Sequence, residues 1–195
     1  TTRADRIGCY GYEKAQTPNL DSLASSGVRF SNTYCQAPLT LPSHCSMLTG
    51  TYPIYHQVHN NGFYYLSPDF LTLGEILKQR GFKTAAFVSS FTVDSRFGVD
   101  QGFDLFDDKF GEEEVMKNLR SERRADKVFG SFSQWLEGNS GQKFFCWMHF
   151  YDPHLPYDPP SPYKEKFSEE PYDGEIAYMD HYVGKTVEAL RDKNI

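Results

Sequence analysis

The stretch of residues 37–50 (APLTLPSHCSMLTG) constrains the fold more than any other part of the chain. Pro38 and Pro42 hold the backbone extended on either side of Thr40, because proline fixes its own φ and pushes the preceding residue out of the helical region. Pro42 also suits the first position of a helix, and the glycine that closes the stretch suits the position after a helix end. We therefore predict a short helix over residues 43–48, with the Thr40 hydroxyl at its mouth.

A hydroxyl group in this place has the surroundings of a nucleophile. The backbone N–H groups at a helix N-terminus attract anions, which favours attack on a sulfate or phosphate ester. An ordinary N-cap threonine would have the same local sequence, since threonine is common at that position. The stretch alone leaves both interpretations of Thr40 open.

The composition is that of a globular, acidic chain. Of its 195 residues, 39% are hydrophobic and 24% are charged, which is typical of a folded domain rather than a disordered one. The formal net charge of −6 argues against a nucleic-acid partner, because phosphate backbones are bound by basic surfaces. No apolar run approaches the roughly 18 residues of a membrane span, so we expect no span within these residues.

The cysteines form neither a Cys-x-x-Cys pair nor a zinc-finger spacing with histidine. We expect buried free thiols rather than a disulfide framework or a metal site, because free cysteine is among the most buried residue types. This expectation covers Cys9, Cys35, Cys45 and Cys146. The cysteine count leaves the compartment open, and a periplasmic, extracellular or membrane-associated parent protein is compatible with it. The oligomeric state is open as well.

Helical and strand patterns alternate along the chain, which is the mark of an α/β fold with a mostly parallel sheet. No repeat or linker divides the chain, so we expect one domain. Loops are expected over residues 1–16, 52–68 and 157–171. The predicted helices cover residues 17–25, 43–48, 71–80, 120–137 and 173–192, and the predicted strands cover residues 28–34, 83–89 and 143–150.

Two further candidate residues lie where predicted strands end. Ser89 closes the strand over residues 83–89, at the carboxyl edge where an α/β fold presents functional groups. His154 follows the strand over residues 143–150, and the prolines on either side of it hold the backbone extended. We expect His154 to face a cleft, although a histidine after a strand also has structural uses.

Two groups of side chains could hold a cation, and both have a plainer interpretation. His56 and His59 have a spacing that suits metal ligation on a helix, but the Asn-Asn-Gly run after them indicates a loop contact or a cleft wall. An acidic cluster is typical of a solvated loop rather than a cation site. Its members are Asp104, Asp107, Asp108, Glu112, Glu113 and Glu114.

The chain resembles the sulfatase family of the alkaline phosphatase superfamily in several ordered motifs. The nucleophile box of that family reads Cys or Ser, any residue, Pro, Ser, Arg, followed by a run ending in Thr-Gly. Here the same frame reads Thr-Leu-Pro-Ser-His over residues 40–44, with Leu-Thr-Gly at 48–50. The other matching segments are DRIGCYG at 5–11, TPNLDSLA at 17–24, GVRF at 27–30, FYDPHLPY at 150–157 and YDGEIAYMD at 172–180.

The resemblance implies an alkaline-phosphatase-like three-layer α/β/α sandwich, of which residues 1–195 would be a single, incomplete catalytic domain. It also implies a divalent metal ion (Ca, Mg, Mn or Zn) that Thr40 would help to bind. The family's carboxylate ligands are expected just before Thr1 and after Ile195, so we expect this chain alone to be inactive.

Two departures from the family pattern bear on the chemistry. True sulfatases oxidise a Cys or Ser to formylglycine, and threonine cannot form that aldehyde because its β-carbon carries a methyl group. His44 replaces the arginine that normally braces the box. The leading hypothesis is therefore a metal-dependent phosphoester hydrolase or transferase with Thr40 as nucleophile and without formylglycine. The alternatives are a true sulfuric ester hydrolase and a non-catalytic module that binds sulfated or phosphorylated glycans.

The resemblance also assigns roles around Thr40. His154 would contact the anionic ester, and His44 would orient Thr40 or contact the substrate. Arg3 would be a further anion contact. The segment Ser89-Ser90-Phe91 would stand where sulfatases place Lys and His, with Ser89 as a substrate contact. The expected partner is a small anionic ester or a glycan.

Overall fold

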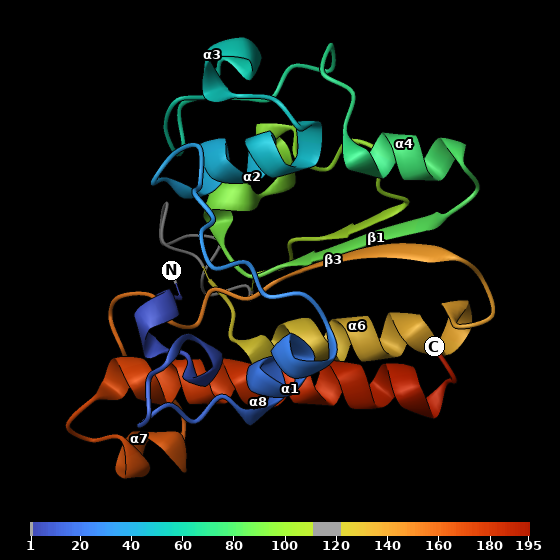
Figure 1. The fold of residues 1–195 in the computed structure, drawn as a ribbon. Helices are drawn as coiled ribbons and strands as arrows, with labels where there is room; N and C mark the ends of the chain where they lie inside the picture. The colour runs from blue at the N-terminus through green and yellow to red at the C-terminus, as the bar shows by residue number, and fades with distance from the viewer. Residues whose placement is uncertain (1, 111–121) are drawn as a thin grey trace. The chain divides into compact units, whose positions relative to one another are not determined.

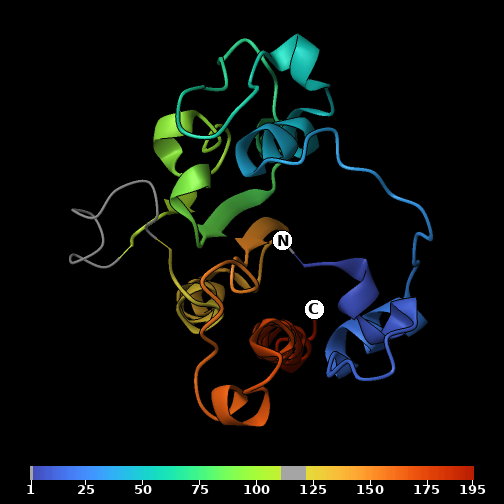
Figure 2. The same cartoon turned by 90° about the vertical axis from the view of Figure 1, so that its left-hand side faces the viewer.

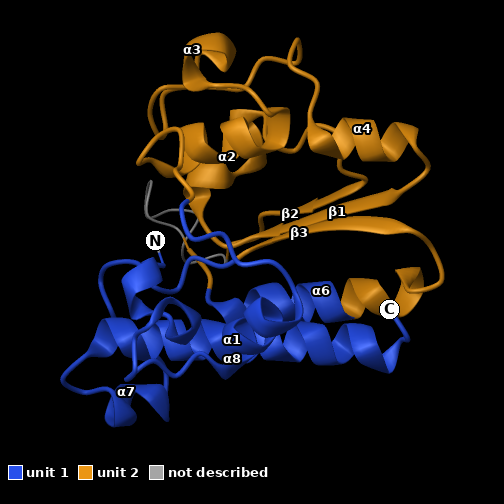
Figure 3. Ribbon diagram, viewed as in Figure 1, with its two compact units in different colours: residues 1–32, 124–133, 150–195 blue, residues 33–123, 134–149 orange. Residues whose placement is uncertain are grey.

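The computed structural model describes residues 2–110 and 122–195. It has an α/β fold whose chain divides into two compact units (Figure 1, Figure 3). Unit 1 comprises residues 1–32, 124–133 and 150–195, and unit 2 comprises residues 33–123 and 134–149. The predicted acidic residues 112–114 and the predicted helix start at 120 lie outside the described residues.

Unit 2 contains a parallel sheet with the strand order β2-β1-β3. β1 (Lys83–Val88) pairs with β3 (Phe144–His149) along its full length, from Lys83 opposite Phe144 to Val88 opposite His149. These two strands confirm the predictions for residues 83–89 and 143–150. β2 (Leu105–Asp107) was not predicted, because it has only three residues and lies in a turn-rich, acidic part of the sequence.

Both faces of this sheet carry packed side chains. Val88 belongs to a buried cluster that includes residues of helix α2 (Thr40–Thr49). Its neighbour Phe87 points to the other face, as successive strand residues do, and meets Trp135 of helix α6 (Ala125–Asn139) at 6.1 Å between ring centroids. Helix α4 (Leu73–Gln79) lies with α2 on the first face (Figure 1).

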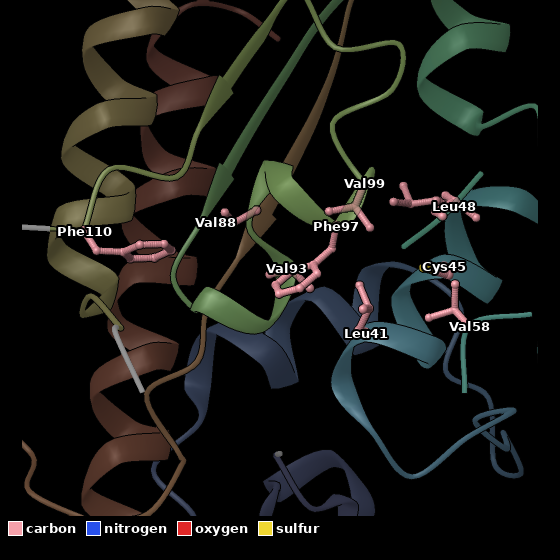
Figure 4. Close-up of a cluster of buried hydrophobic side chains, with 10 residues drawn as sticks. Leu41, Cys45, Leu48, Val58, Val88, Val93, Phe97, Val99 and Phe110 are labelled. Atoms are coloured by element: carbon pink, nitrogen blue, oxygen red, sulfur yellow. The ribbon is translucent and has the colours of Figure 1, made fainter. Parts of the chain in front are cut away.

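The buried cluster of unit 2 gathers side chains from α2, from β1 and from the turns that follow it (Figure 4). Those turns include the 3₁₀ segments η3 (Phe91–Val93) and η4 (Ser95–Phe97). Helix α2 contributes Leu41, Cys45 and Leu48 to the cluster. These three residues recur at helical spacing, so one apolar face of α2 packs against the cluster. Its members are Leu41, Cys45, Leu48, Val58, Leu66, Val88, Val93, Phe97, Val99 and Phe110.

Unit 1 is built on the long helix α8 (Pro171–Asp192), and α1 (Pro18–Ser26) lies alongside it, as Figure 2 shows. Asp180 of α8 accepts hydrogen bonds from the Asn19 amide (3.1 Å), the Asn19 side chain (2.8 Å) and the Leu20 amide (2.8 Å). These bonds satisfy N–H groups that the first turn of α1 leaves free. Gly184 is needed at this contact, because a Cβ there would lie 2.5 Å from Asn19.

The remaining described elements are short and occupy stretches predicted as loops. They are η1 (Ala4–Arg6), η2 (Gly8–Tyr10), α3 (Pro53–His56) and α7 (Tyr163–Lys166). None of the helices in the described residues is both long and apolar enough to cross a membrane. The cysteines are free thiols as expected, but the expectation that all four are buried is wrong: Cys45 is buried, Cys9 and Cys146 are half-buried, and Cys35 is exposed.

The predicted strand over residues 28–34 is wrong. The segment forms no strand, and Val28 and Tyr34 are 81% and 80% exposed. Its alternation of apolar and polar residues suits a strand, but a strand needs a neighbour to bind its backbone N–H and C=O groups. No described residue pairs with this segment in the sheet.

Thr17 precedes helix α1 as predicted, but its hydroxyl does not cap the helix. The Thr17 hydroxyl oxygen instead accepts the Gly8 amide N–H at 3.0 Å. The bond joins the start of α1 to the preceding 3₁₀ turn, so Thr17 contributes to the loop rather than to the helix end.

A buried arginine joins the carboxyl ends of β1 and β2. The Arg123 guanidinium donates to the Val88 carbonyl (2.8 Å), to the Asp107 carbonyl (2.7 Å) and to the Asp107 carboxylate (3.1 Å). Both side chains are largely buried, at 7% and 12% exposure. This corrects the interpretation of the acidic cluster as a solvated loop for one member, Asp107. Asp104 is also engaged, in an ion pair with Lys78 at 2.9 Å.

We predict that Arg123→Ala destabilises the fold by about 3–5 kcal/mol, because it removes a largely buried positive charge from the Asp107 carboxylate and three hydrogen bonds from the ends of β1 and β2. The neighbouring Arg124→Ala is the matched control. Arg124 makes an exposed pair with Asp158 at 3.5 Å, and such pairs contribute at most about 1 kcal/mol. Urea unfolding of both variants gives the comparison, and equal losses would contradict the assignment.

Candidate active site

Helix α2 places Thr40 at its first residue rather than just before it. The helix runs from Thr40 to Thr49, with Leu39 as an extended N-cap, so the predicted start at residue 43 was late by three positions. Pro42 is tolerated in the first turn, because the N–H groups there have no intrahelical partner. The predicted end is confirmed: Gly50 adopts φ 67° and donates its amide N–H to the Ser46 carbonyl at 2.9 Å.

The loop predicted after this helix holds the first turn of α2. The Asn61 side-chain oxygen accepts the Leu41 amide N–H at 2.9 Å. This bond satisfies one of the free N–H groups at the helix start from a residue 20 positions later in the chain. The sequence indicated a turn at Asn61 but gave no sign of this contact.

His44 lies one helical turn after Thr40 and binds its backbone. Nδ1 of His44 is 2.7 Å from the Thr40 carbonyl oxygen. A carbonyl oxygen only accepts, so Nδ1 carries the proton and Nε2 is the acceptor nitrogen of the neutral ring. Burial lowers the pKa of His44, which favours this neutral form. The structure thus brings together two of the predicted site residues.

His149, which the sequence analysis did not select, is the buried neighbour of His44. It is the last residue of β3, and its ring meets the His44 ring edge-on at 4.8 Å between centroids. Burial holds the pKa of His149 well below its usual range, and the neighbouring His44 adds to this effect. The available signal was a polar residue in the otherwise apolar run FFCWMHF, at the carboxyl end of a predicted strand.

Ser89 lies at the same sheet edge, directly after β1. Its side chain is fully buried, and its backbone carbonyl accepts the Arg123 amide N–H at 2.8 Å. Within the described residues, its hydroxyl oxygen has no hydrogen-bond partner. A buried, unsatisfied hydroxyl is costly, so this oxygen is available for a ligand or a water molecule.

Arg3 and His154 belong to unit 1, whereas Thr40, His44 and Ser89 belong to unit 2. The Arg3 guanidinium makes two hydrogen bonds to the Asp5 carboxylate, at 2.9 and 2.6 Å, and this exposed pair competes with any anion. His154 donates from Nδ1 to the Leu155 carbonyl at 2.9 Å, and its ring stacks on Tyr151 at 4.2 Å. Burial lowers the pKa of His154.

His56 is a buried histidine with a structural role, not a metal ligand. Its Nδ1 accepts the Val58 amide N–H at 3.2 Å, and its Nε2 donates to the Ser46 hydroxyl at 3.0 Å. Both ring nitrogens are therefore used within the protein, and His56 has no lone pair for a metal ion. His59 instead meets Tyr64 edge-on at 5.5 Å.

The residues that the structure describes do not form the metal site that the resemblance implies. The described part of the chain contains no group of three or more His, Cys, Asp or Glu side chains arranged to hold a metal ion. The Thr40 hydroxyl alone is not a ligand set.

Asp152, in the turn before His154, is a buried carboxylate at the start of α6. One carboxylate oxygen accepts the Ala125 amide N–H at 2.9 Å, and the other is buried without a partner among the described residues. Desolvation by burial raises the pKa of Asp152 to about 6, against the lowering effect of the Ala125 bond. In the sequence, Asp152 was noticed only as a neighbour of the candidate His154, and its buried contact with Ala125 was not predicted.

Comparison with known proteins gives a consistent assignment. The family model Sulfatase matches residues 1–195. The N-acetylglucosamine-6-O-sulfatase of Bacteroides thetaiotaomicron is 30% identical over 203 residues, which is 95% of this chain and 34% of that protein. The chain thus spans about a third of this relative's length.

Solved structures show the same fold. The phosphonate monoester hydrolase of Agrobacterium radiobacter superposes with a TM-score of 0.79 at 18% identity, over 97% of this chain and 57% of that chain. The C-terminal periplasmic domain of EcEptC from Escherichia coli, in complex with Zn, superposes with a TM-score of 0.72 at 19% identity, over 99% and 57%. At these identities the likeness concerns the fold.

We predict that Asp152→Asn stabilises the fold in a pH-dependent way. The folded-state pKa of about 6 exceeds the usual 3.8, so the stabilising contribution of Asp152 is fully present below pH 3.8 and is lost as the pH rises to about 6. Asparagine keeps an oxygen for the Ala125 amide and does not ionise. The stability difference should grow by about 2–3 kcal/mol between pH 4 and 7. A difference that is constant with pH in urea unfolding would contradict this account.

Proposed function

The chain belongs to the sulfatase family, and we propose that the intact protein is a metal-dependent phosphoester hydrolase or transferase with Thr40 as its nucleophile. One observation carries the proposal: Thr40 is the first residue of α2, and a neutral His44 binds its carbonyl. The metal dependence is proposed from family resemblance, because the described residues supply no ligand set.

Threonine favours the phosphoester over the sulfate ester for a chemical reason. The formylglycine of true sulfatases is an aldehyde, and the methyl group on the threonine β-carbon prevents its formation. A hydroxyl that attacks directly forms a covalent ester, which water must then cleave at the central atom. The phosphorus centre allows both displacements with the same threonine, and covalent catalysis of this kind splits one difficult step into two.

The proposed reaction has two steps, in which Thr40 first takes up the phosphoryl group and then releases it. Thr40 Oγ bonds to phosphorus while the bond from phosphorus to the leaving oxygen breaks, and the alcohol departs after taking up a proton. The threonine proton passes to a base, and the neutral imidazole of His44 lies one turn away. Water, or an acceptor alcohol in a transferase, then displaces Thr40 Oγ from phosphorus and restores the hydroxyl.

The start of α2 contributes to both steps. Charge on the non-bridging oxygens faces a helix N-terminus, where backbone N–H groups and the helix dipole stabilise anions. Ser89, whose buried hydroxyl has no hydrogen-bond partner in the described part of the chain, is the proposed additional contact to the ester. His154 is proposed as a second contact, whereas Arg3 would first have to release Asp5.

Hydrolysis of a sulfate ester is the second candidate, and one observation favours it. The relative with 30% identity is described as an N-acetylglucosamine-6-O-sulfatase, which acts on a sulfate ester of an amino sugar. This alternative requires an activation of Thr40 that the structure does not provide. A sulfated or phosphorylated glycan is a proposed substrate class under either chemistry.

We predict that Thr40→Ala in the full-length protein lowers turnover of phosphoesters by about 10³-fold or more, because it removes the nucleophile. The assay compares aryl sulfate, aryl phosphate and bis-aryl phosphate with added divalent metal ions, and a chelator should abolish turnover. Thr49→Ala is the matched control. Thr49 lies at the other end of α2 and binds the Cys45 carbonyl at 2.7 Å, so its loss should change turnover by less than about tenfold.

The outcomes separate the candidates. Turnover of sulfate alone that depends on Thr40 would replace the phosphoester proposal with the sulfatase alternative. Wild-type turnover in Thr40→Ala would exclude Thr40 as the nucleophile. Ligand binding without turnover of any ester would indicate the non-catalytic glycan-binding module.

A further inference from the structure

We propose that His149 is a positioning residue that fixes His44 against Thr40 and thereby sets the start of helix α2 on the sheet. The inference rests on the proposed function, because Thr40 is the proposed nucleophile. It adds a residue that acts without touching the substrate.

The contacts form a continuous path from the sheet to Thr40. His149 is fixed by its place in β3, where it is the register partner of Val88 in β1. Its ring meets His44 edge-on at 4.8 Å, with an interplanar angle of 87°. His44 in turn donates from Nδ1 to the Thr40 carbonyl at 2.7 Å. Each link is a direct contact within unit 2.

The two contacts on His44 restrain different motions of its ring. The hydrogen bond fixes where Nδ1 lies, but the ring can still tilt about that bond. The edge-on contact with His149 opposes this tilt. The Trp147 ring, with its centroid 5.5 Å from that of His44, restricts the His44 ring from a second direction. Edge-to-face contacts between aromatic rings are favourable beyond the area that they bury. Together these contacts hold the His44 ring in one orientation, in which Nδ1 donates to the Thr40 carbonyl.

The restraint comes from the His149 ring rather than from a hydrogen bond. The side chain is buried at the end of a strand whose other residues are apolar or aromatic, apart from a cysteine. A ring packed in this way has little room to move away from His44. An aromatic ring at position 149 is therefore the feature that the restraint requires.

Positioning matters here because the proposed reaction needs Thr40 Oγ in line with the ester. A misplacement of about 1 Å can cost about 10²-fold in rate. A loose His44 would free the Thr40 carbonyl from one of its hydrogen bonds and let the first turn of α2 fray. Removal of His149 should therefore lower kcat more than it changes KM.

The test is a double-mutant cycle of His44→Ala and His149→Ala in the full-length protein. We expect His149→Ala to lower the Thr40-dependent kcat by about 10- to 100-fold with little change in KM. In the His44→Ala background the same change should have little further effect, because its target is gone. His149→Phe keeps a ring beside His44 and should restore most of kcat. His181→Ala, at an exposed histidine of α8, is the control.

A second measurement does not depend on turnover. Selective ¹⁵N labelling of histidine in the full-length protein reports the His44 tautomer, and the His44→Ala variant assigns its signals. We expect Nδ1 to carry the proton in the wild type and in His149→Phe, and a mixture of tautomers in His149→Ala. Loss of turnover in all proteins would count against the proposed function and leave this readout intact.

Two results would overturn the inference. One is an equal loss of kcat from His149→Ala with and without His44, which would show that His149 acts independently. The other is an unchanged His44 tautomer in a folded His149→Ala variant.

Discussion

The burial of one face of helix α2 is the interaction on which the rest of the site depends. Leu41, Cys45 and Leu48 point into the core of unit 2, where they join Val88 of the central strand (Figure 4). Fully burying side chains of this size contributes roughly 1.5–3 kcal/mol each. This anchoring places the polar start of the helix, with Thr40, at a defined distance from the sheet, and every other contact of the site refines that placement.

The carboxyl edge of the sheet supplies the other polar groups of the candidate site. Parallel pairing of β1 with β3 brings Ser89 and His149 to the same edge, and Arg123 closes the neighbouring end between β1 and β2. The site therefore combines a helix start, which attracts anions, with strand ends that carry fixed polar groups. His44 connects the two, because it contacts both Thr40 and His149.

Local signals in the sequence predicted much of this fold. The prolines and the glycine around α2 indicated its place, and apolar runs indicated β1 and β3, because these signals come from the residues themselves. The signals failed where a distant partner decides the outcome. Residues 28–34 have the alternation of a strand but no described partner, whereas β2 exists because β1 lies beside it.

The residues of the candidate site also divide into those that local sequence predicts and those that depend on distant partners. Thr40 and His44 are one turn apart, so local sequence and the family motif identified both. Arg123 and His149 are separated from their partners by long stretches of chain, and nothing near them in the sequence records those contacts. His149 had one available sign, a polar residue at the end of an apolar run, whereas Arg123 stands in the polar run SERR and had none.

The central claim is that Thr40 forms a covalent bond to the substrate's phosphorus atom. The most direct measurement is rapid quenching of the full-length protein during turnover of a phosphodiester, followed by proteolysis and mass spectrometry of the peptide that carries Thr40. The account predicts a phosphoryl adduct on Thr40 that forms and decays at rates compatible with turnover. Sustained turnover with an unmodified Thr40, or an adduct on another residue, would contradict it.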